Sequence, residues 1–210
     1  MPGSDSITRF FEVWSAERWG VEDLTLSTVT DRQLDELECS IGHSFPPLYR
    51  EFLKTYHFRS LNTPVLRFYL HPPLTWQVKL NEMYRKAWLP ERILGMGLIP
   101  FGDEAMAEAG PVCFDATRKA ENGDYPVVFW DHDWVSTKKE IRPLFSSSEA
   151  MFRCLTFYAE QDVDFIRCDE DDSSAQFGQK RRLLAQFLAL DPSGAGREAR
   201  GYWTCWGVSP

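Results

Sequence analysis

The stretch Thr30–Tyr56, TDRQLDELECSIGHSFPPLYREFLKTY, predicts two helices joined by a tight corner. Thr30 and Gln33 have the spacing of a capping box, in which each side chain accepts a hydrogen bond from a free backbone N–H at the helix start. Apolar residues then recur at i, i+3 and i+7, which places them on one face of the first helix. These residues are Leu34, Leu37 and Ile41.

The corner and the second helix follow directly. Gly42 lies where a helix end requires a left-handed residue, a conformation that glycine adopts without steric cost. Pro46 and Pro47 suit the first turn of a new helix, because proline lacks the N–H that this turn leaves unpaired. The second helix is predicted to have Leu48, Tyr49, Phe52, Leu53 and Tyr56 on its apolar face, with Arg50, Glu51 and Lys54 on the opposite face.

This succession of an acidic helix, a glycine, an apolar-proline corner and an aromatic helix resembles the opening signature of the SUKH superfamily. That superfamily is the fold of a yeast cell-wall-synthesis regulator and of many bacterial immunity proteins. A second matching stretch lies in residues 98–102, 110–115 and 126–130. The resemblance runs from Ile7 to Tyr158. It departs after the second helix, where residues 57–59 (His-Phe-Arg) replace the usual glycine pair.

Shorter patterns predict the remaining elements. An apolar stripe after Ser6 predicts a helix that ends at Gly20, and residues 74–88 read as an irregular helix ended by Pro90. Ser146 and Glu149 have capping-box spacing and predict another helix start. Strands are predicted at residues 65–69, 98–101, 110–114 and 127–130, with a polar edge or hairpin at 135–139.

Helices, then strands, then helix again indicate an α+β fold. The turns between the strands are too short for parallel crossovers, so we expect a mostly antiparallel sheet. The resemblance implies the same: a mixed, mostly antiparallel sheet packed by helices, here with a helical and aromatic C-terminal extension. We expect residues 1–160 to form one SUKH-like domain. Residues 161–210, an acidic loop, a helix ended by Asp191-Pro192 and an aromatic tail, are expected to dock on it.

Composition and cysteine spacing limit the function. The sequence has 43% hydrophobic and 14% aromatic residues, enough for a packed core. It has no run of about 18 apolar residues that would predict a transmembrane helix. The first ten residues lack the basic start and apolar core of a signal peptide. The five cysteines are widely spread without a CxxC, which argues against a zinc site or a disulfide framework and favours the cytoplasm.

Negative charge is concentrated in the second half of the chain. Residues 100–172 contain 17 acids and 7 bases, a net charge of −10 in a chain whose total is −8. Such a surface repels phosphate backbones, so we expect no binding to nucleic acid. It attracts a basic protein, because complementary fields speed association and select against wrong partners. The alternative is that the acids only keep the protein soluble.

The run Trp130-Asp131-His132-Asp133-Trp134 is the strongest candidate for a site. On a strand Asp131 and Asp133 face together while His132 faces away, so a metal or acid–base centre needs ligands from elsewhere. An interaction edge is the better interpretation, since tryptophans beside carboxylates suit contacts with basic residues. The candidate partner-binding residues are Asp103, Glu104, Trp130, Asp131, Asp133 and Trp134.

Other chemistry finds little support in the sequence. The acidic block at residues 169–172 lacks the alternating ligands and the central glycine of a calcium loop. No dinucleotide-binding or phosphate-binding glycine motif and no nucleophile-elbow motif occurs. Nothing pairs a cysteine nucleophile with a histidine. We therefore expect neither catalysis nor a cofactor.

The resemblance implies a protein that binds a bacterial toxin, such as a nuclease or a deaminase, and neutralises it by direct contact. The acidic second half is compatible, because nuclease toxins present basic surfaces that face nucleic acid. Two other hypotheses stay open: a regulatory scaffold like the yeast member, and a hydrolase that uses Asp131 and Asp133. The toxin-binding protein and the scaffold both require a protein partner. The hydrolase requires a metal-dependent activity that is lost when Asp131 or Asp133 is replaced.

Overall fold

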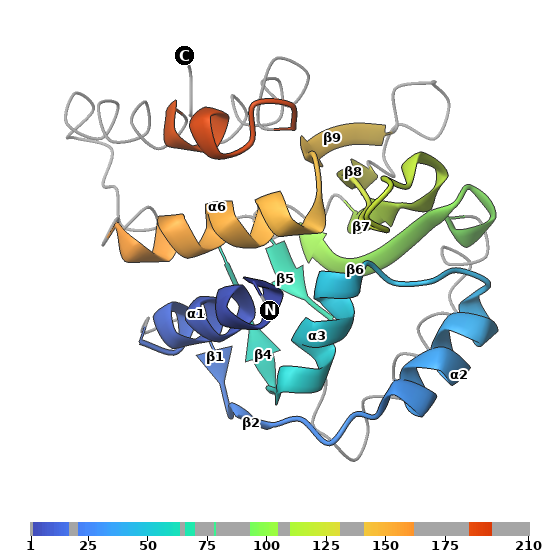
Figure 1. Cartoon of the computed structure of the whole chain (residues 1–210), viewed down its shortest axis with the longest axis horizontal. Coiled ribbons are helices and arrows are strands. Elements are labelled where there is room, and N and C mark those ends of the chain that lie inside the picture. Colours follow the sequence, from blue (N-terminus) through green and yellow to red (C-terminus); the bar gives the residue numbers. More distant parts are fainter. Residues whose placement is uncertain are drawn as a thin grey trace.

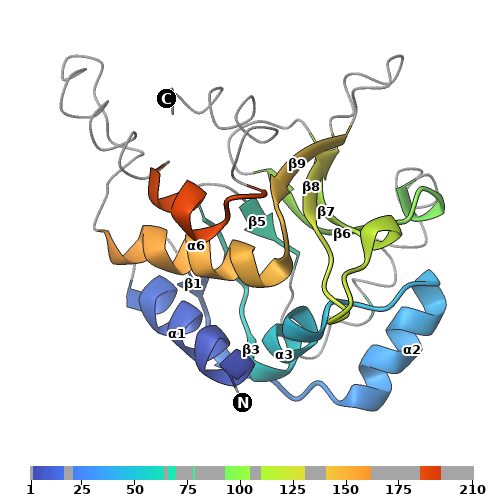
Figure 2. The same ribbon diagram turned by 45° about the horizontal axis from the view of Figure 1, so that its top comes forward.

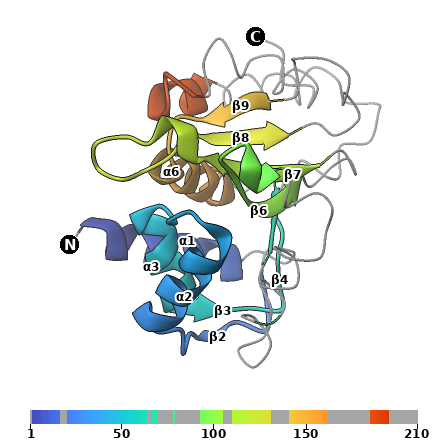
Figure 3. The ribbon, with the colours of Figure 1, turned by 90° about the vertical axis from the view of Figure 1, so that its right-hand side faces the viewer.

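The computed structural model describes residues 2–16, 21–63, 66–69, 78, 93–104, 110–130, 141–161 and 185–194 (Figure 1). Figure 3 shows strands β6 to β9 of a sheet on one side and helices α1, α2 and α3 on the other. Helices packed on antiparallel strands confirm the predicted α+β fold. The longer helices are α1 (Pro2–Ala16), α2 (Asp31–Ile41), α3 (Pro47–Thr55) and α6 (Ser148–Glu160), with a 3-10 turn η1 (Ala116–Arg118).

The predicted helix start and corner are confirmed. The Thr30 side chain accepts a hydrogen bond from the Gln33 N–H at 3.3 Å, and the Gln33 side chain accepts one from the Thr30 N–H at 3.0 Å. Gly42 ends α2 with a φ of 74°, in the left-handed region. A Cβ at this position would meet no atom within 4 Å, so the need for glycine is conformational. The predicted apolar face of α2 is buried: Leu34, Leu37 and Ile41.

Helix α3 lies at the centre of the main core. It ends at Thr55, so Tyr56 begins strand β3 rather than continuing the helix. Phe52 on α3 stacks on Phe11 of α1 with ring centroids 5.1 Å apart, and its ring lies 5.2 Å from that of Phe152 on α6. Aromatic pairs of this kind contribute about 0.5–1.5 kcal/mol beyond their area burial. One aromatic cluster therefore holds three helices together.

Helix α6 begins at a different serine from the one that the sequence predicts. Its N-cap is Ser147, whose side chain accepts a hydrogen bond from a backbone N–H of the first turn at 3.0 Å. The predicted capping box of Ser146 and Glu149 is therefore wrong, because three consecutive serines offer the same chemistry. Buried Asp124 decides between them. It accepts hydrogen bonds from the N–H and the hydroxyl of Ser148 at 3.1 and 2.7 Å.

The main sheet has the order β5-β6-β7-β8-β9, and every pairing in it is antiparallel, as predicted. The predicted strand at 98–101 extends to Glu104. The sequence pattern does not predict β9, since Pro143 interrupts its alternation. The strands are β5 (Leu66–Phe68), β6 (Leu98–Glu104), β7 (Pro111–Asp115), β8 (Val127–Trp130) and β9 (Ile141–Phe145).

Two short antiparallel strand pairs also occur in the described part of the chain. The sequence pattern predicts neither, because two-residue strands are too short to show alternation. His57, in the stretch that departs from the family pattern, is buried, and its Nε2 lies 3.2 Å from Ser27 Oγ. The pairs are β1 (Val21–Glu22) with β4 (Ser60–Leu61), and β2 (Thr25–Leu26) with β3 (Tyr56–His57).

The sheet is apolar on both of its faces. One face belongs to the main core, to which strands β7 and β8 contribute Val112, Phe114, Val127 and Phe129. The residues that alternate with these belong to a smaller cluster on the other face, which we call the second core. Strands buried on both faces read as continuous apolar runs, such as VVFW at residues 127–130. The second core comprises Ile93, Leu98, Cys113, Val128 and Trp130.

Residues 185–190 form a helix (Figure 2). Its Phe187 is buried in the main core. Asp191 follows the last helical residue, where the sequence predicts the helix end. No helix in the described segments is long and apolar enough to cross a membrane.

Some predictions lie outside the described residues. They concern the helix at 74–88, of which only Val78 is described, and the polar edge at 135–139. They also concern the acidic loop at 162–174 and the aromatic tail at 202–206. The boundary between residues 160 and 161 and the docking of the whole extension stay predictions.

Candidate functional site

Asp103 is the predicted site residue whose surroundings are defined most fully. It lies near the end of β6, directly opposite Arg67 of β5 on one side and Pro111 of β7 on the other. Leu66 and Phe68, which flank Arg67, are buried in the main core, whereas Arg67 is exposed. Because directly opposite residues share a face of a sheet, Arg67 and Asp103 both face away from the main core.

A tyrosine hydroxyl holds the Asp103 carboxylate. Tyr69, just beyond the end of β5, donates a hydrogen bond from its hydroxyl to Asp103 Oδ1. Burial raises the pKa of the Asp103 carboxyl group, and the hydrogen bond from Tyr69 and the charge of Arg67 only partly oppose this effect. Ionising Asp103 in the folded protein is therefore costly. Groups whose pKa is shifted in this way cluster at functional sites.

Strands β6 and β8 finish at the same end of the sheet. Gly102 and Phe129 both pair with Val112 of β7, so Asp103 and Trp130 each stand one residue further along their strands. Neighbouring strands are about 4.8 Å apart, which separates the two strand ends by only about 10 Å. We call this region the sheet end. Its described residues are Arg67, Tyr69, Asp103, Glu104 and Trp130.

The other predicted site residues have different outcomes. Glu104 is the last residue of β6 and pairs with Leu66. Trp130 is fully buried in the second core and so is not available for direct contact with a partner. The expected direct contact is therefore corrected for Trp130. Strand alternation turns its side chain into the second core, where it supports the end of β8. Three predicted residues lie outside the described segments and stay predictions: Asp131, Asp133 and Trp134.

Sequence reasoning missed Arg67 and Tyr69 as parts of this region. Their strand is predicted, and its alternation already indicates that Arg67 faces away from the core. The sequence does not contain the strand register, which brings Tyr69 to Asp103 from 34 residues away. No local pattern could therefore have found the pair.

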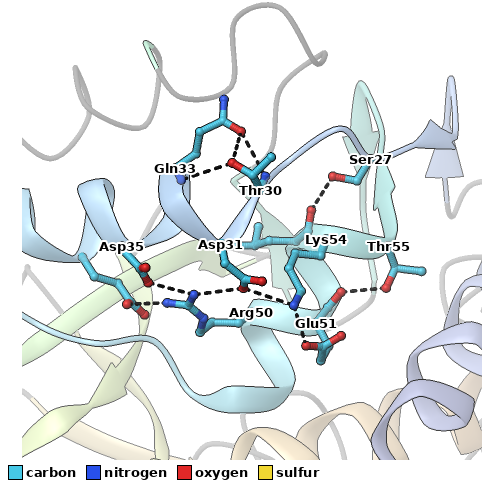
Figure 4. A network of polar contacts seen from close by, with 11 residues as sticks. Ser27, Thr30, Asp31, Gln33, Asp35, Arg50, Glu51, Lys54 and Thr55 are labelled. Atoms are coloured by element: carbon cyan, nitrogen blue, oxygen red, sulfur yellow. Dashed lines mark hydrogen bonds and ion pairs between the residues drawn. The ribbon is translucent and has the colours of Figure 1, made fainter.

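A second polar cluster joins α2 to α3 (Figure 4). Arg50 contacts Asp31, Asp35 and Glu38 at 3.1, 2.9 and 2.5 Å, and Lys54 contacts Asp31 at 3.2 Å. Hydrogen bonds from Arg50 and Lys54 lower the pKa of Asp31. The charged face predicted for α3 is thus turned toward the acids of α2. Since these charges pair with one another, the cluster is a structural joint between the helices.

The described residues present no metal-binding cluster, and two of their cysteines are buried. Within the described residues, no group of three or more His, Cys, Asp or Glu side chains is placed to hold a metal ion. Cys113 and Cys154 are fully buried. Burial raises the pKa of both thiols, to about 12 for Cys154. A thiol with a raised pKa is protonated at neutral pH and is a weak nucleophile.

Comparison with known proteins gives one family. The model of the SMI1/KNR4 family (SUKH-1) matches residues 28–154, more than half of the chain. The matched region contains α2, α3, the strands of the main sheet and the first half of α6. All residues of the sheet end lie inside it. A search of curated proteins gives no match.

Proposed function

Because the chain belongs to the SMI1/KNR4 family (SUKH-1), we propose that it is an immunity protein that binds a cognate bacterial toxin and neutralises it by direct contact. Domains of this family are known as toxin-immunity or regulatory domains and are generally non-catalytic. We propose that the toxin is a nuclease or another effector that acts on nucleic acid, and that this protein binds it in the cytoplasm.

The state of Asp103 is the observation that carries the proposal. This acid is half-buried, burial raises its pKa, and it faces away from the main core. Such a carboxylate reduces the stability of the free protein, whereas a basic group of a partner would stabilise its ionised form. Natural proteins tolerate such a cost where the residue serves binding.

The charge of the chain supports a basic partner. The net charge of −10 in residues 100–172 includes Asp103, Glu104, Asp131 and Asp133. Toxins that act on nucleic acid present basic surfaces, and a field of opposite sign speeds their encounter with the inhibitor. An inhibitor of this charge would compete with the phosphate backbone for the same surface.

We propose that the contact surface begins at the sheet end. Asp103 and Glu104 finish β6, while Asp131 directly follows Trp130, the last residue of β8. Asp131, Asp133 and Trp134 are proposed to make direct contacts, and Trp130 to support them from the second core. Truncating a carboxylate that pairs with a toxin arginine in the complex should cost about 2–5 kcal/mol of binding free energy.

The test is complex formation with the product of the neighbouring gene at low and at high salt. We expect tight binding that weakens as salt rises, and a large loss of affinity in Asp103→Asn. Glu121→Gln is the matched control, because Glu121 is an exposed acid in the turn at the opposite end of the sheet. Equal affinities for both variants would contradict the proposed surface. Binding that does not depend on salt would contradict the proposed charge complementarity.

The second candidate is a regulatory scaffold, because the family is known for regulatory as well as toxin-immunity domains. A scaffold would bind several partners without abolishing the activity of any of them. An immunity protein binds one toxin and stops its activity at equal molar amounts. Titrating the activity of the bound partner against this protein therefore separates the two functions.

A further inference from the structure

Residues 185–194 cover the side of α6 that faces away from α1. Figures 1 and 2 both show α6 between α1 and this segment, which is drawn in red. Phe187 is 1% exposed, and its ring centroid lies 6.4 Å from that of Phe145 at the end of β9. Leu188 and Leu190 are partly buried against the same core. The segment lies outside the residues 28–154 that match the family.

A single carboxylate fastens this segment to the start of α6. Asp191 is 2% exposed; its Oδ2 accepts a hydrogen bond from the Ser146 N–H at 2.8 Å and its Oδ1 accepts one from the Gly194 N–H at 3.1 Å. Its own N–H bonds the carbonyl of Phe187 at 2.8 Å and closes the short helix. Hydrogen bonds to an ionised acceptor are about twice as strong as neutral ones. Asp191 therefore links the helix end, the following turn and the β9–α6 junction.

Glycine is the only residue that the packing admits at position 194. A Cβ on Gly194 would lie 2.0 Å from the Ser146 nitrogen and 2.4 Å from the carbonyl carbon of Phe145. Both atoms belong to the backbone, so neither can rotate aside. The turn after the helix is thus fitted closely against the junction between β9 and α6.

We propose that residues 185–194 form a C-terminal clasp that opens from α6 as a unit while the main sheet stays folded. Residues 185–194 attach through one buried aromatic ring, two partly buried leucines, one carboxylate and one close backbone approach. The sheet, by contrast, is held by continuous pairing through five strands and by cores on both faces. Segments with few anchors open at lower free energy than the core elements that they cover. The clasp does not depend on the proposed toxin.

Two buried cysteines can report this opening separately. Cys154 lies on α6, near enough to Asp191 for that charge to add to burial in raising its pKa. Cys113 lies in the second core, on the other face of the sheet. Both side chains are fully buried in the closed protein. Local opening of the clasp should expose Cys154 alone, whereas global unfolding should expose both.

The experiment is thiol labelling of the full-length chain under native conditions, with Cys39, Cys168 and Cys205 replaced by serine and the labelled sites located by peptide mass. In Gly194→Ala we expect Cys154 to be labelled about tenfold faster or more, whereas the labelling rate of Cys113 should stay unchanged. A tenfold ratio corresponds to a decrease of about 1.4 kcal/mol in the free energy of opening the clasp. Asp191→Asn should give a smaller increase in the same direction. Ser193→Ala changes an exposed neighbour and is the matched control. A parallel increase at Cys113, or no increase at Cys154, would overturn the clasp.

Discussion

Arg50 Nη1 on α3 lies 2.5 Å from Glu38 Oε2 on α2. The other carboxylate oxygen of Glu38 accepts a hydrogen bond from the Phe45 N–H at 2.6 Å. Glu38 thus binds the second helix and the corner that leads to it at the same time. Both charged side chains are mostly buried, with 20% of Arg50 and 13% of Glu38 exposed. The joint between the helices is therefore set by a partly desolvated ion pair as well as by apolar packing.

Removing this ion pair should destabilise the protein. Arg50→Met leaves the Glu38 carboxylate partly buried without its cation, so we expect the free energy of unfolding to fall by about 2 kcal/mol, between the values for exposed and buried pairs. Urea denaturation measures the change. Arg32→Met is the control, because its pair with Glu36 is largely exposed, and it should give no measurable change. Similar small effects in both variants would contradict the assigned role of Arg50.

The acid at the sheet end should give the free protein a distinct pH dependence. Because burial raises the pKa of folded Asp103 above its usual value of 3.8, the unfolded chain ionises first as pH rises. Stability is therefore lost as pH rises through this window and stays low above the folded pKa. Asp103→Asn keeps an acceptor for Tyr69 and removes the charge. We expect this variant to become more stable than the original protein as pH rises toward neutrality.

Thermal unfolding at several pH values measures this difference in stability. Glu121→Gln controls for removing one negative charge from the surface. A stability difference between Asp103→Asn and the original protein that does not change with pH would contradict the argument from burial.

Asp124 should be a strong determinant of the α6 start. Its carboxylate accepts hydrogen bonds from the N–H groups of Tyr125, Ser148 and Glu149 at 2.7, 3.1 and 3.3 Å, besides the Ser148 hydroxyl. Asp124→Ala leaves several buried donors unpaired, so we expect a loss of about 3 kcal/mol. Ser147→Ala removes only the N-cap and should cost about 1 kcal/mol. The prediction fails if the two variants unfold at the same urea concentration.

Two glycines should respond differently to alanine. At Gly42 there is open space, so an alanine side chain would meet no neighbouring atom. Gly42→Ala should lower the free energy of unfolding by about 1–2 kcal/mol, because only the left-handed backbone conformation is unfavourable for alanine. At Gly102 a Cβ would lie 2.6 Å from the carbonyl oxygen of Arg67. Gly102→Ala should therefore push β5 away from β6 and disturb the sheet end, with a loss of about 2–3 kcal/mol in the free energy of unfolding. Amide exchange at β5 should increase in Gly102→Ala and stay unchanged in Gly42→Ala, and the reverse pattern would refute this reasoning.

The sequence predicts those parts of the fold that depend on local chemistry. The capping box at Thr30, the left-handed Gly42 and the buried strand at residues 127–130 all follow from spacing alone. The start of α6 was not decidable in this way, because the choice among three serines depends on Asp124, 24 residues away. The local sequence therefore offers several possible N-caps for α6, and the contact with Asp124 determines which serine is used.

The candidate site was predictable only in part, for the same reason. Asp103 stands out in the sequence as an acid after a buried strand, but its partners Arg67 and Tyr69 depend on the strand register. The burial of Trp130 depends on which face of the sheet is covered, and both faces are. A tryptophan beside acids therefore looks like a surface anchor in sequence, although its side chain lies in the second core.

The most direct test of the account is neutralisation of the neighbouring gene's toxin. The toxin is produced in a host with and without this protein, and the activity of the purified toxin is titrated with the purified chain. We predict that the chain restores growth and abolishes toxin activity at equal molar amounts, and that Asp103→Asn does so less effectively than Glu121→Gln. Full toxin activity in the presence of excess chain would contradict the proposed immunity function.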